Sequence, residues 1–141
     1  MTGNYNIFIG DEAGVNTTTA YSNTILGYRA SYNLTTGYDN VLNGYLSGFD
    51  LTEGYQNTLI GKEAGTNIVT GYGNTLLGYR AAYGSNSNSY YNVSIGSLSG
   101  LGLTTGSTNT FIGSRAGDNV TSGSNNIIIG YNVDASSSSI P

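Results

Sequence analysis

The chain lacks cysteine, histidine and tryptophan altogether, and only 9% of its 141 residues are charged. The absence of cysteine means that no disulfide holds the fold. Without cysteine and histidine, zinc sites of the usual kind, Ser-His-Asp triads and Cys-His pairs are all excluded. The net charge of -4 argues against nucleic acid as a partner, because binding it takes clustered basic residues. No apolar run reaches the roughly 18 residues of a transmembrane helix, so we expect no membrane insertion.

Glycine and tyrosine are abundant instead, with 22 and 13 copies. Low hydrophobicity with many Gly and Ser residues is common in disordered chains, but those chains have few aromatics and usually a high net charge. Aromatic residues make up 11% of this chain, and its net charge is small. We therefore expect one folded domain that is held together by regular stacking of the backbone.

An asparagine recurs along the chain at intervals of 17 residues, with a single interval of 18. A glycine stands four residues after each asparagine, and the residue directly after each asparagine is Thr, Val or Ile. Short β-branched segments bounded by Asn and Gly are typical of strands and turns. The two columns are Asn6, Asn23, Asn40, Asn57, Asn74, Asn92, Asn109 and Asn126, and Gly10, Gly27, Gly44, Gly61, Gly78, Gly96, Gly113 and Gly130.

A unit of this length is too short for a propeller blade, and its glycine density excludes a helical repeat. One coil of a solenoid fits it, with each coil about 4.8 Å above the last. We predict an all-β fold, a parallel β-solenoid of about eight 17-residue coils, each built as strand, turn, strand, turn. The solenoid domain covers residues 1–134, and residues 135–141 form a serine-rich tail.

The repeat has two irregularities. One extra residue is inserted within residues 85–91. Residues 2–5 match the last four residues of a unit, so the first coil begins in the middle of a repeat. We expect the chain to be a fragment of a longer fibre.

In a solenoid, each residue lies above its equivalent in the previous coil. The asparagine column is expected to form a ladder of side-chain amides, and the glycine column a turn that needs positive φ or close backbone approach. Glu12 would lie under Arg29, and Glu63 under Arg80, which brings opposite charges together. These pairs favour the same register as the asparagines.

The segment after each asparagine carries adjacent apolar residues, which must point to opposite faces of a strand. We expect one face to fill the coil and the other to form an apolar stripe along the outside. Such a stripe is typical of a protein–protein interface and predicts a homo-oligomer, most simply a trimer. A wide coil that encloses both residues is the alternative. The predicted interface residues are Phe8, Ile25, Leu42, Leu59, Leu76, Phe111 and Ile128.

Residues 92–99 resemble the head repeats of trimeric autotransporter adhesins of the YadA type, in which a strand with Asn, Val and Ile precedes Gly and a small residue. Residues 36–40 and 109–117 are similar to repeats of phage and phage-like tail-fibre proteins. The resemblance covers residues 6–132. It implies a left-handed parallel β-roll, three chains side by side, and a role in attachment to a surface.

Two tyrosine columns run through the repeat. Exposed tyrosines offer an apolar ring face and a hydroxyl, which suits a sugar ring, so a surface glycan or another receptor is a candidate partner. The competing interpretation is that the rings stack on one another or line a subunit interface. The candidate ligand-binding residues are Tyr21, Tyr38, Tyr55, Tyr72 and Tyr90, and the second column holds Tyr28, Tyr45 and Tyr79.

We predict no catalytic residues, no metal site and no cofactor, and hence no enzyme. The local carboxylate pairs, Asp11 with Glu12 and Asp50 with Glu53, are the candidates for acid–base chemistry. The place of Glu12 beneath Arg29 accounts for that carboxylate without catalysis. The aspartate-containing repeats of calcium-binding rolls do not occur in the sequence.

We therefore expect a structural or adhesive segment of a trimeric fibre, extracellular or on a virion surface, that attaches to a host or another surface. The alternatives are a stand-alone glycan-binding module, a self-assembling filament subunit that grows through open coil ends, and an ice-binding solenoid. Ice binding would need a regular Thr-x-Thr array, whereas the threonines of this sequence form adjacent pairs.

Overall fold

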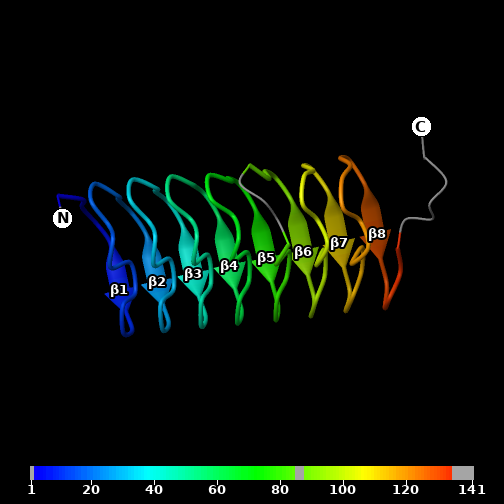
Figure 1. Cartoon of the computed structure of the whole chain (residues 1–141), viewed down its shortest axis with the longest axis horizontal. Coiled ribbons are helices and arrows are strands. Elements are labelled where there is room, and N and C mark those ends of the chain that lie inside the picture. The colour runs from blue at the N-terminus through cyan, green and yellow to red at the C-terminus, as the bar shows by residue number, and fades with distance from the viewer. Residues whose placement is uncertain (1, 85–87, 135–141) are drawn as a thin grey trace.

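The computed structural model of the chain describes residues 2–84 and 88–134. They form a rod in which the chain winds through successive coils from one end to the other (Figure 1). The predicted tail at residues 135–141, and part of the segment that holds the inserted residue, lie outside the described residues. The described part contains no helix, and so none long and apolar enough to cross a membrane.

Each coil contributes one strand to a single parallel sheet, whose eight strands follow one another in sequence order. Ile25 pairs with Leu42, 17 residues on, and the one longer step is between β5 and β6, where Thr75 pairs with Val93. The predicted parallel β-solenoid is confirmed. The strands are β1 (Ile7–Ile9), β2 (Thr24–Leu26), β3 (Val41–Asn43), β4 (Thr58–Ile60), β5 (Thr75–Leu77), β6 (Val93–Ile95), β7 (Thr110–Ile112) and β8 (Ile127–Ile129).

In the residues that the structure describes, the second strand expected in each coil is not formed as a strand. Only isolated parallel bridges occur there, such as the one between Tyr21 and Tyr38. Backbone hydrogen bonds still join the coils at this place, for example from the Thr35 N–H to the Thr52 carbonyl at 2.9 Å. Residues with positive φ, such as Asp39 at 55°, bend the backbone in each coil and prevent a continuous extended run.

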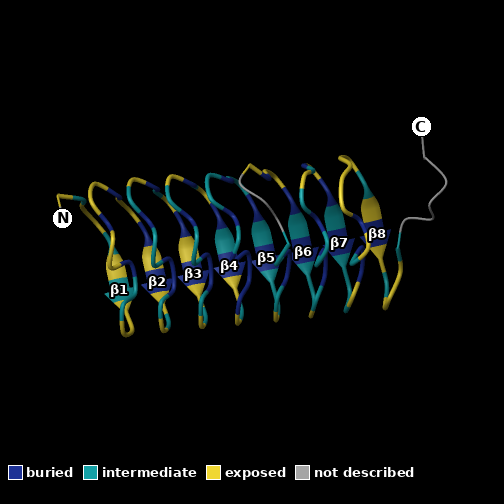
Figure 2. Cartoon of the chain, viewed as in Figure 1, coloured by how far each residue is buried: buried dark blue, intermediate teal, exposed yellow. Residues whose placement is uncertain are grey.

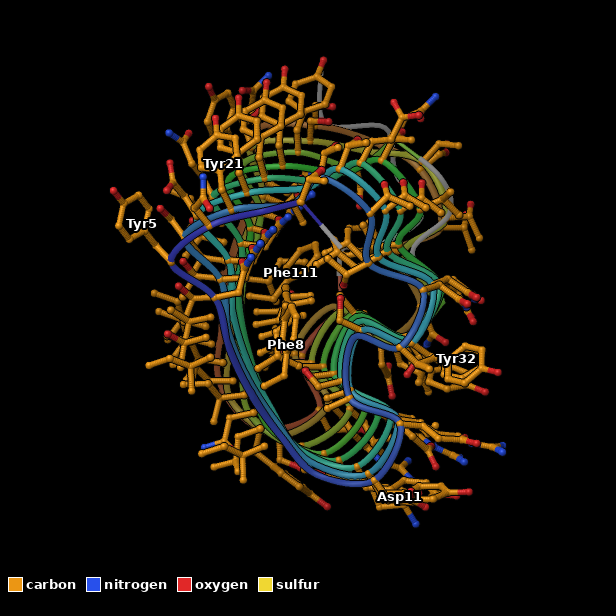
Figure 3. The ribbon with its side chains drawn as sticks, turned by 90° about the vertical axis from the view of Figure 1, so that its left-hand side faces the viewer. Tyr5, Phe8, Asp11, Tyr21, Tyr32 and Phe111 are labelled. Atoms are coloured by element: carbon orange, nitrogen blue, oxygen red, sulfur yellow. The ribbon has the colours of Figure 1, made fainter. Side chains whose placement is uncertain are left out.

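The core lies inside the coils and is built around the middle residue of each strand. From β2 to β8 this residue is buried, while its two neighbours are half-buried or exposed (Figure 2). The predicted outward direction of these side chains is therefore wrong. Figure 3 shows Phe8 and Phe111 pointing into the coil. The residues that lie inside, and so cannot form an outer stripe, are Phe8, Ile25, Leu42, Leu59, Leu76, Phe111 and Ile128.

The reason is the direction of the asparagines. Each asparagine points inward, as the burial of Asn40 and Asn57 shows. Side chains alternate along an extended segment, so the residue two positions after each asparagine also points inward. The residues directly after the asparagine and directly before the glycine therefore form the outer surface of the sheet.

Small residues and a leucine-rich column complete the core. Ala30, Ala64 and Ala81 are buried against the strand centres, and Leu34, Leu51 and Ile68 fill the other side of the coil. At β6, the middle residue is Ser94 instead of a large apolar side chain. The buried apolar residues separate into two clusters at this coil.

Candidate functional site

The asparagine ladder fixes the position of every strand. The Asn40 N–H and Nδ2 both donate to Oδ1 of Asn23 at 3.0 Å, and Nδ2 also donates to the Gly54 carbonyl at 2.8 Å. The Asn40 Oδ1 in turn accepts from the N–H and Nδ2 of Asn57. Each amide between the two ends of the ladder therefore has partners in the coil below and the coil above, which allows it to be buried without an unpaired polar group.

The glycine after each strand is required by both conformation and space. Gly44 has a φ of 148°, and a Cβ built on it would lie 2.3 Å from the Gly61 carbonyl oxygen. The other members of this column have φ values of 127–141°. The column therefore forces a turn that brings successive coils into backbone contact.

The first and third residues of each strand form an exposed surface along the rod, which we call the outer strand face. Its side chains are apolar or neutral, and Ile7, Ile9 and Ile129 are 54%, 58% and 63% exposed. Seven steps of about 4.8 Å make it about 34 Å long. The outer strand face consists of Ile7, Ile9, Thr24, Leu26, Val41, Asn43, Thr58, Ile60, Thr75, Leu77, Val93, Ile95, Thr110, Ile112, Ile127 and Ile129.

Threonine on this face does not form the regular array that ice binding would need. Thr24, Thr58, Thr75 and Thr110 each occupy the first position of a strand. The third position of those strands is Leu or Ile. The outer strand face therefore carries single threonines beside an apolar row, and no Thr-x-Thr strand.

The first tyrosine column forms a stack that we call the tyrosine ladder: Tyr21, Tyr38, Tyr55, Tyr72 and Tyr90. Successive ring centroids are 4.7–5.2 Å apart, and the ring planes differ by 4–7°. Figure 3 shows Tyr21 at an outer corner of the coil, with the other rings of the ladder in a row behind it. Burial within the stack raises the pKa of Tyr72, with a further contribution from Tyr55. The inner rings cover each other's faces and leave only edges and hydroxyls exposed.

The second tyrosine column contains a lysine. Tyr28 stacks on Tyr45 with centroids 5.5 Å apart. The Lys62 Nζ then lies 5.3 Å from the Tyr45 ring centroid and 5.9 Å from that of Tyr79. An ammonium group here continues the column by cation–π contacts. This role of Lys62 was not predicted, although its spacing of 17 residues from both Tyr45 and Tyr79 indicates it.

The two predicted ion pairs are present. Arg29 binds Glu12 and Arg80 binds Glu63, each one coil apart. The hydrogen bond that Arg80 Nε donates to Glu63 raises the pKa of Arg80. The Glu63 side chain is only 12% exposed and also lies 3.8 Å from Lys62 Nζ, whereas Glu12 is 37% exposed.

Among the other carboxylates, Asp118 lies beside Asp134, and burial together with this neighbour raises the pKa of Asp118. Asp50 accepts a hydrogen bond from Asn33 Nδ2 at 3.2 Å. In the part of the chain that the structure describes, no three His, Cys, Asp or Glu side chains lie close enough to hold a metal ion.

A cavity of about 520 Å³ lies where the tyrosine ladder ends. Tyr90, Thr104, Thr105, Ser107, Ser122 and Ser124 line it, with the backbone of three successive coils. Ser107 and Ser124 occupy the ladder position in the two coils that follow Tyr90. This cavity was not predicted; its signal in the sequence is the replacement of tyrosine by serine at those two positions.

The chain matches no protein-family model, and neither curated proteins nor solved structures gave a significant match to it.

Proposed function

We propose that this chain is a structural segment of an extracellular or virion-surface fibre, in which identical rods associate side by side through the outer strand face. The fibre attaches a phage or a bacterium to a host or another surface. Three chains are the simplest assembly, as the resemblance to adhesin head repeats implies. The observation that carries the proposal is the outer strand face itself, an apolar surface that runs along the rod.

The composition of this face favours contact with protein over contact with water. A strand that is apolar on both faces is usually buried on both. Here Leu59 and Leu76 fill the inside, while Ile60 and Leu77 point outward. Contiguous apolar surface of this extent on a soluble protein marks an interaction site.

A second copy of the same chain is the occupant that fits best. Its outer strand face has the same spacing of about 4.8 Å between strands, so the apolar rows of two rods can interdigitate along their whole length. The face carries no charged residue, so identical faces meet without like-charge repulsion. Because the spacing between strands is uniform, two rods can stay in contact over all of their coils, which suits a fibre.

The mass of the purified chain in dilute solution, measured by light scattering, tests the proposal. We expect a mass near three times 14.7 kDa. Ile60→Lys places a charge in the middle of the outer strand face and should lower the mass to that of one chain. Its matched control is Val15→Lys, because Val15 is 54% exposed and lies outside that face. Circular dichroism checks that both variants keep their strands.

Two results would contradict the proposal. One is a wild-type mass equal to that of a single chain at all concentrations. The other is a multimer that survives Ile60→Lys or is lost equally in Val15→Lys, because either result would place the contact elsewhere on the rod.

A further inference from the structure

The tyrosine ladder ends partway along the rod, at Tyr90, and one face of that ring is left uncovered. Tyr72 stacks on one face of Tyr90, with centroids 5.2 Å apart. Tyr91 meets Tyr90 edge-on, with planes at 89°, and leaves the second face open. In the next coil the ladder position is Ser107, which has no ring. Tyr90 is accordingly 40% exposed, whereas Tyr55 in the middle of the ladder is half-buried.

Tyr90, Ser107 and Ser124 all line the cavity of about 520 Å³, so it lies on the side of Tyr90 where the ladder would continue. This volume is in the usual range for small-molecule sites and suits one or two sugar rings. Its lining in the described residues consists of one aromatic residue, Tyr90, together with serines, threonines, glycines and Asn88. None of these lining residues is charged.

The hydroxyls around the cavity have hydrogen-bonding capacity left. Ser107 Oγ accepts a hydrogen bond from the Tyr90 N–H at 3.4 Å, and Ser124 Oγ accepts one from the Ser107 N–H at 3.0 Å. Each serine hydroxyl therefore still has its own hydrogen to donate. Thr104 Oγ1 donates to the Thr121 carbonyl at 2.7 Å and keeps its lone pairs to accept.

We propose that this cavity binds a neutral sugar. One pyranose ring stacks on the open face of Tyr90, in the place where the next ring of the tyrosine ladder would lie. A pyranose has an apolar face that suits an aromatic ring, and its hydroxyls can both donate and accept around the ring edge. The uncharged lining favours a neutral sugar over an acidic or a basic one. The site goes beyond the proposed fibre function, since it does not involve the outer strand face.

Binding is tested with the methyl pyranosides of glucose, galactose, mannose and N-acetylglucosamine, by saturation-transfer NMR on the whole chain. We expect at least one to bind, with a Kd of the order of 1 mM, as is common for a shallow site with one stacking contact. Tyr90→Leu removes the ring platform and should weaken binding about 10-fold or more, which corresponds to about 1.4 kcal/mol. Ser107→Tyr adds a ring that continues the ladder, so it should fill the site and abolish binding while the fold is kept.

The matched control is Tyr38→Leu. Both faces of Tyr38 are covered, by Tyr21 and by Tyr55, so this variant should bind the sugar as the wild type does. Several results would overturn the site: no saturable binding of any of the four sugars, binding that survives Ser107→Tyr, or equal loss in Tyr38→Leu. Binding of a planar phenol such as p-cresol without binding of any sugar would also overturn it. The light-scattering mass of the wild type and of each variant is measured in parallel. If no sugar binds while the mass still shows association, only the sugar site is overturned; if the mass is that of one chain, the proposed association fails independently of the sugar site.

Discussion

Asn57 lies one coil above Asn40, and its Nδ2 donates to the Asn40 Oδ1 at 3.1 Å. The same Nδ2 donates to the Gly71 carbonyl at 2.9 Å. The Asn57 Oδ1 accepts from the N–H and Nδ2 of Asn74. A buried side chain with this many partners is expected to contribute strongly to stability, because its removal leaves groups in two neighbouring coils unpaired.

Asn57→Ala should therefore lower the free energy of unfolding by about 3 kcal/mol or more, because each unpaired buried polar group costs about 1–3 kcal/mol. Urea denaturation followed by circular dichroism measures the change. The control is Asn16→Ala, because Asn16 is exposed and its side chain donates only one long hydrogen bond, to Asn33 Oδ1 at 3.4 Å. We expect the control to change stability by less than about 0.5 kcal/mol. Equal effects of the two variants would show that the ladder does not hold the coils together.

Two buried serines should respond to alanine with opposite signs. Ser94 Oγ is buried without a hydrogen-bond partner, whereas Ser99 Oγ donates to the Phe111 carbonyl at 3.0 Å. Ser94→Ala removes an unpaired hydroxyl and should stabilise the fold by about 1 kcal/mol. Ser99→Ala loses a buried hydrogen bond and should destabilise it by about 1 kcal/mol. Thermal unfolding of both variants beside the wild type measures the difference, and a shift in the same direction for both would refute this assignment.

Ser31 occupies a position where most coils have glycine. It has a φ of 50°, and its Oγ is buried without a partner. Ser31→Gly should stabilise the protein by about 1–2 kcal/mol, because it relieves the left-handed conformation. The reverse change in a neighbouring coil, Gly48→Ala, should destabilise by about 2 kcal/mol, since its Cβ would lie 2.4 Å from Leu42 Cδ2 at a φ of 57°. Chemical denaturation curves of the two variants provide the test; a loss of stability in Ser31→Gly would be inconsistent with strain at this position.

The coil that contains β7 should become more stable in mild acid. Burial, and then the nearby Asp134, raise the pKa of Asp118 above its ordinary value of 3.8, while Arg115 lowers it. A carboxyl whose pKa is raised by folding favours the folded state when it is protonated. The contribution of Asp118 to stability is therefore present below pH 3.8, the ordinary value, and is lost as the pH rises through the higher pKa of the folded state. Asp118→Asn should stabilise this coil at pH 7 and remove this part of the pH dependence. Hydrogen exchange of the Val120 amide, which donates to the Gly117 carbonyl at 3.2 Å, reports on the coil. Slower exchange of this amide in the wild type at pH 7 than at pH 4, after correction for the intrinsic rate, would contradict the predicted gain in stability at lower pH.

The period of the sequence was sufficient to predict the coil, the register and the charge pairs. Residues at equal positions must stack in a solenoid, and Glu12 and Arg29 do so. The direction of the strand side chains was not predicted correctly, because a row of apolar residues such as Ile25 and Leu26 has two equally apolar faces. The inward asparagine decides between them. The spacing predicts the amide ladder, such as the bond from Asn23 Nδ2 to Asn6 Oδ1, but the bond from Asn23 Nδ2 to the Gly37 carbonyl is not evident from it.

The tyrosine columns were evident from the sequence, but their chemistry was not. Stacking of Tyr38 between Tyr21 and Tyr55 hides the faces that a sugar would need. What matters for binding is where the column stops, at Ser107. The cavity there depends on the path of three successive coils, which a repeat pattern does not specify.

The most direct test of side-by-side association through the outer strand face is the accessibility of isoleucine methyl groups to a soluble paramagnetic reagent, measured by NMR in the wild type and in Ile60→Lys. We predict that Ile25 and Ile68, which are buried inside the coil, stay protected in both proteins. Ile95 and Ile112 of the outer strand face should be protected in the wild type and become accessible in Ile60→Lys. Access of the reagent to Ile25, or equal access to Ile95 and Ile112 in both proteins, would contradict the account.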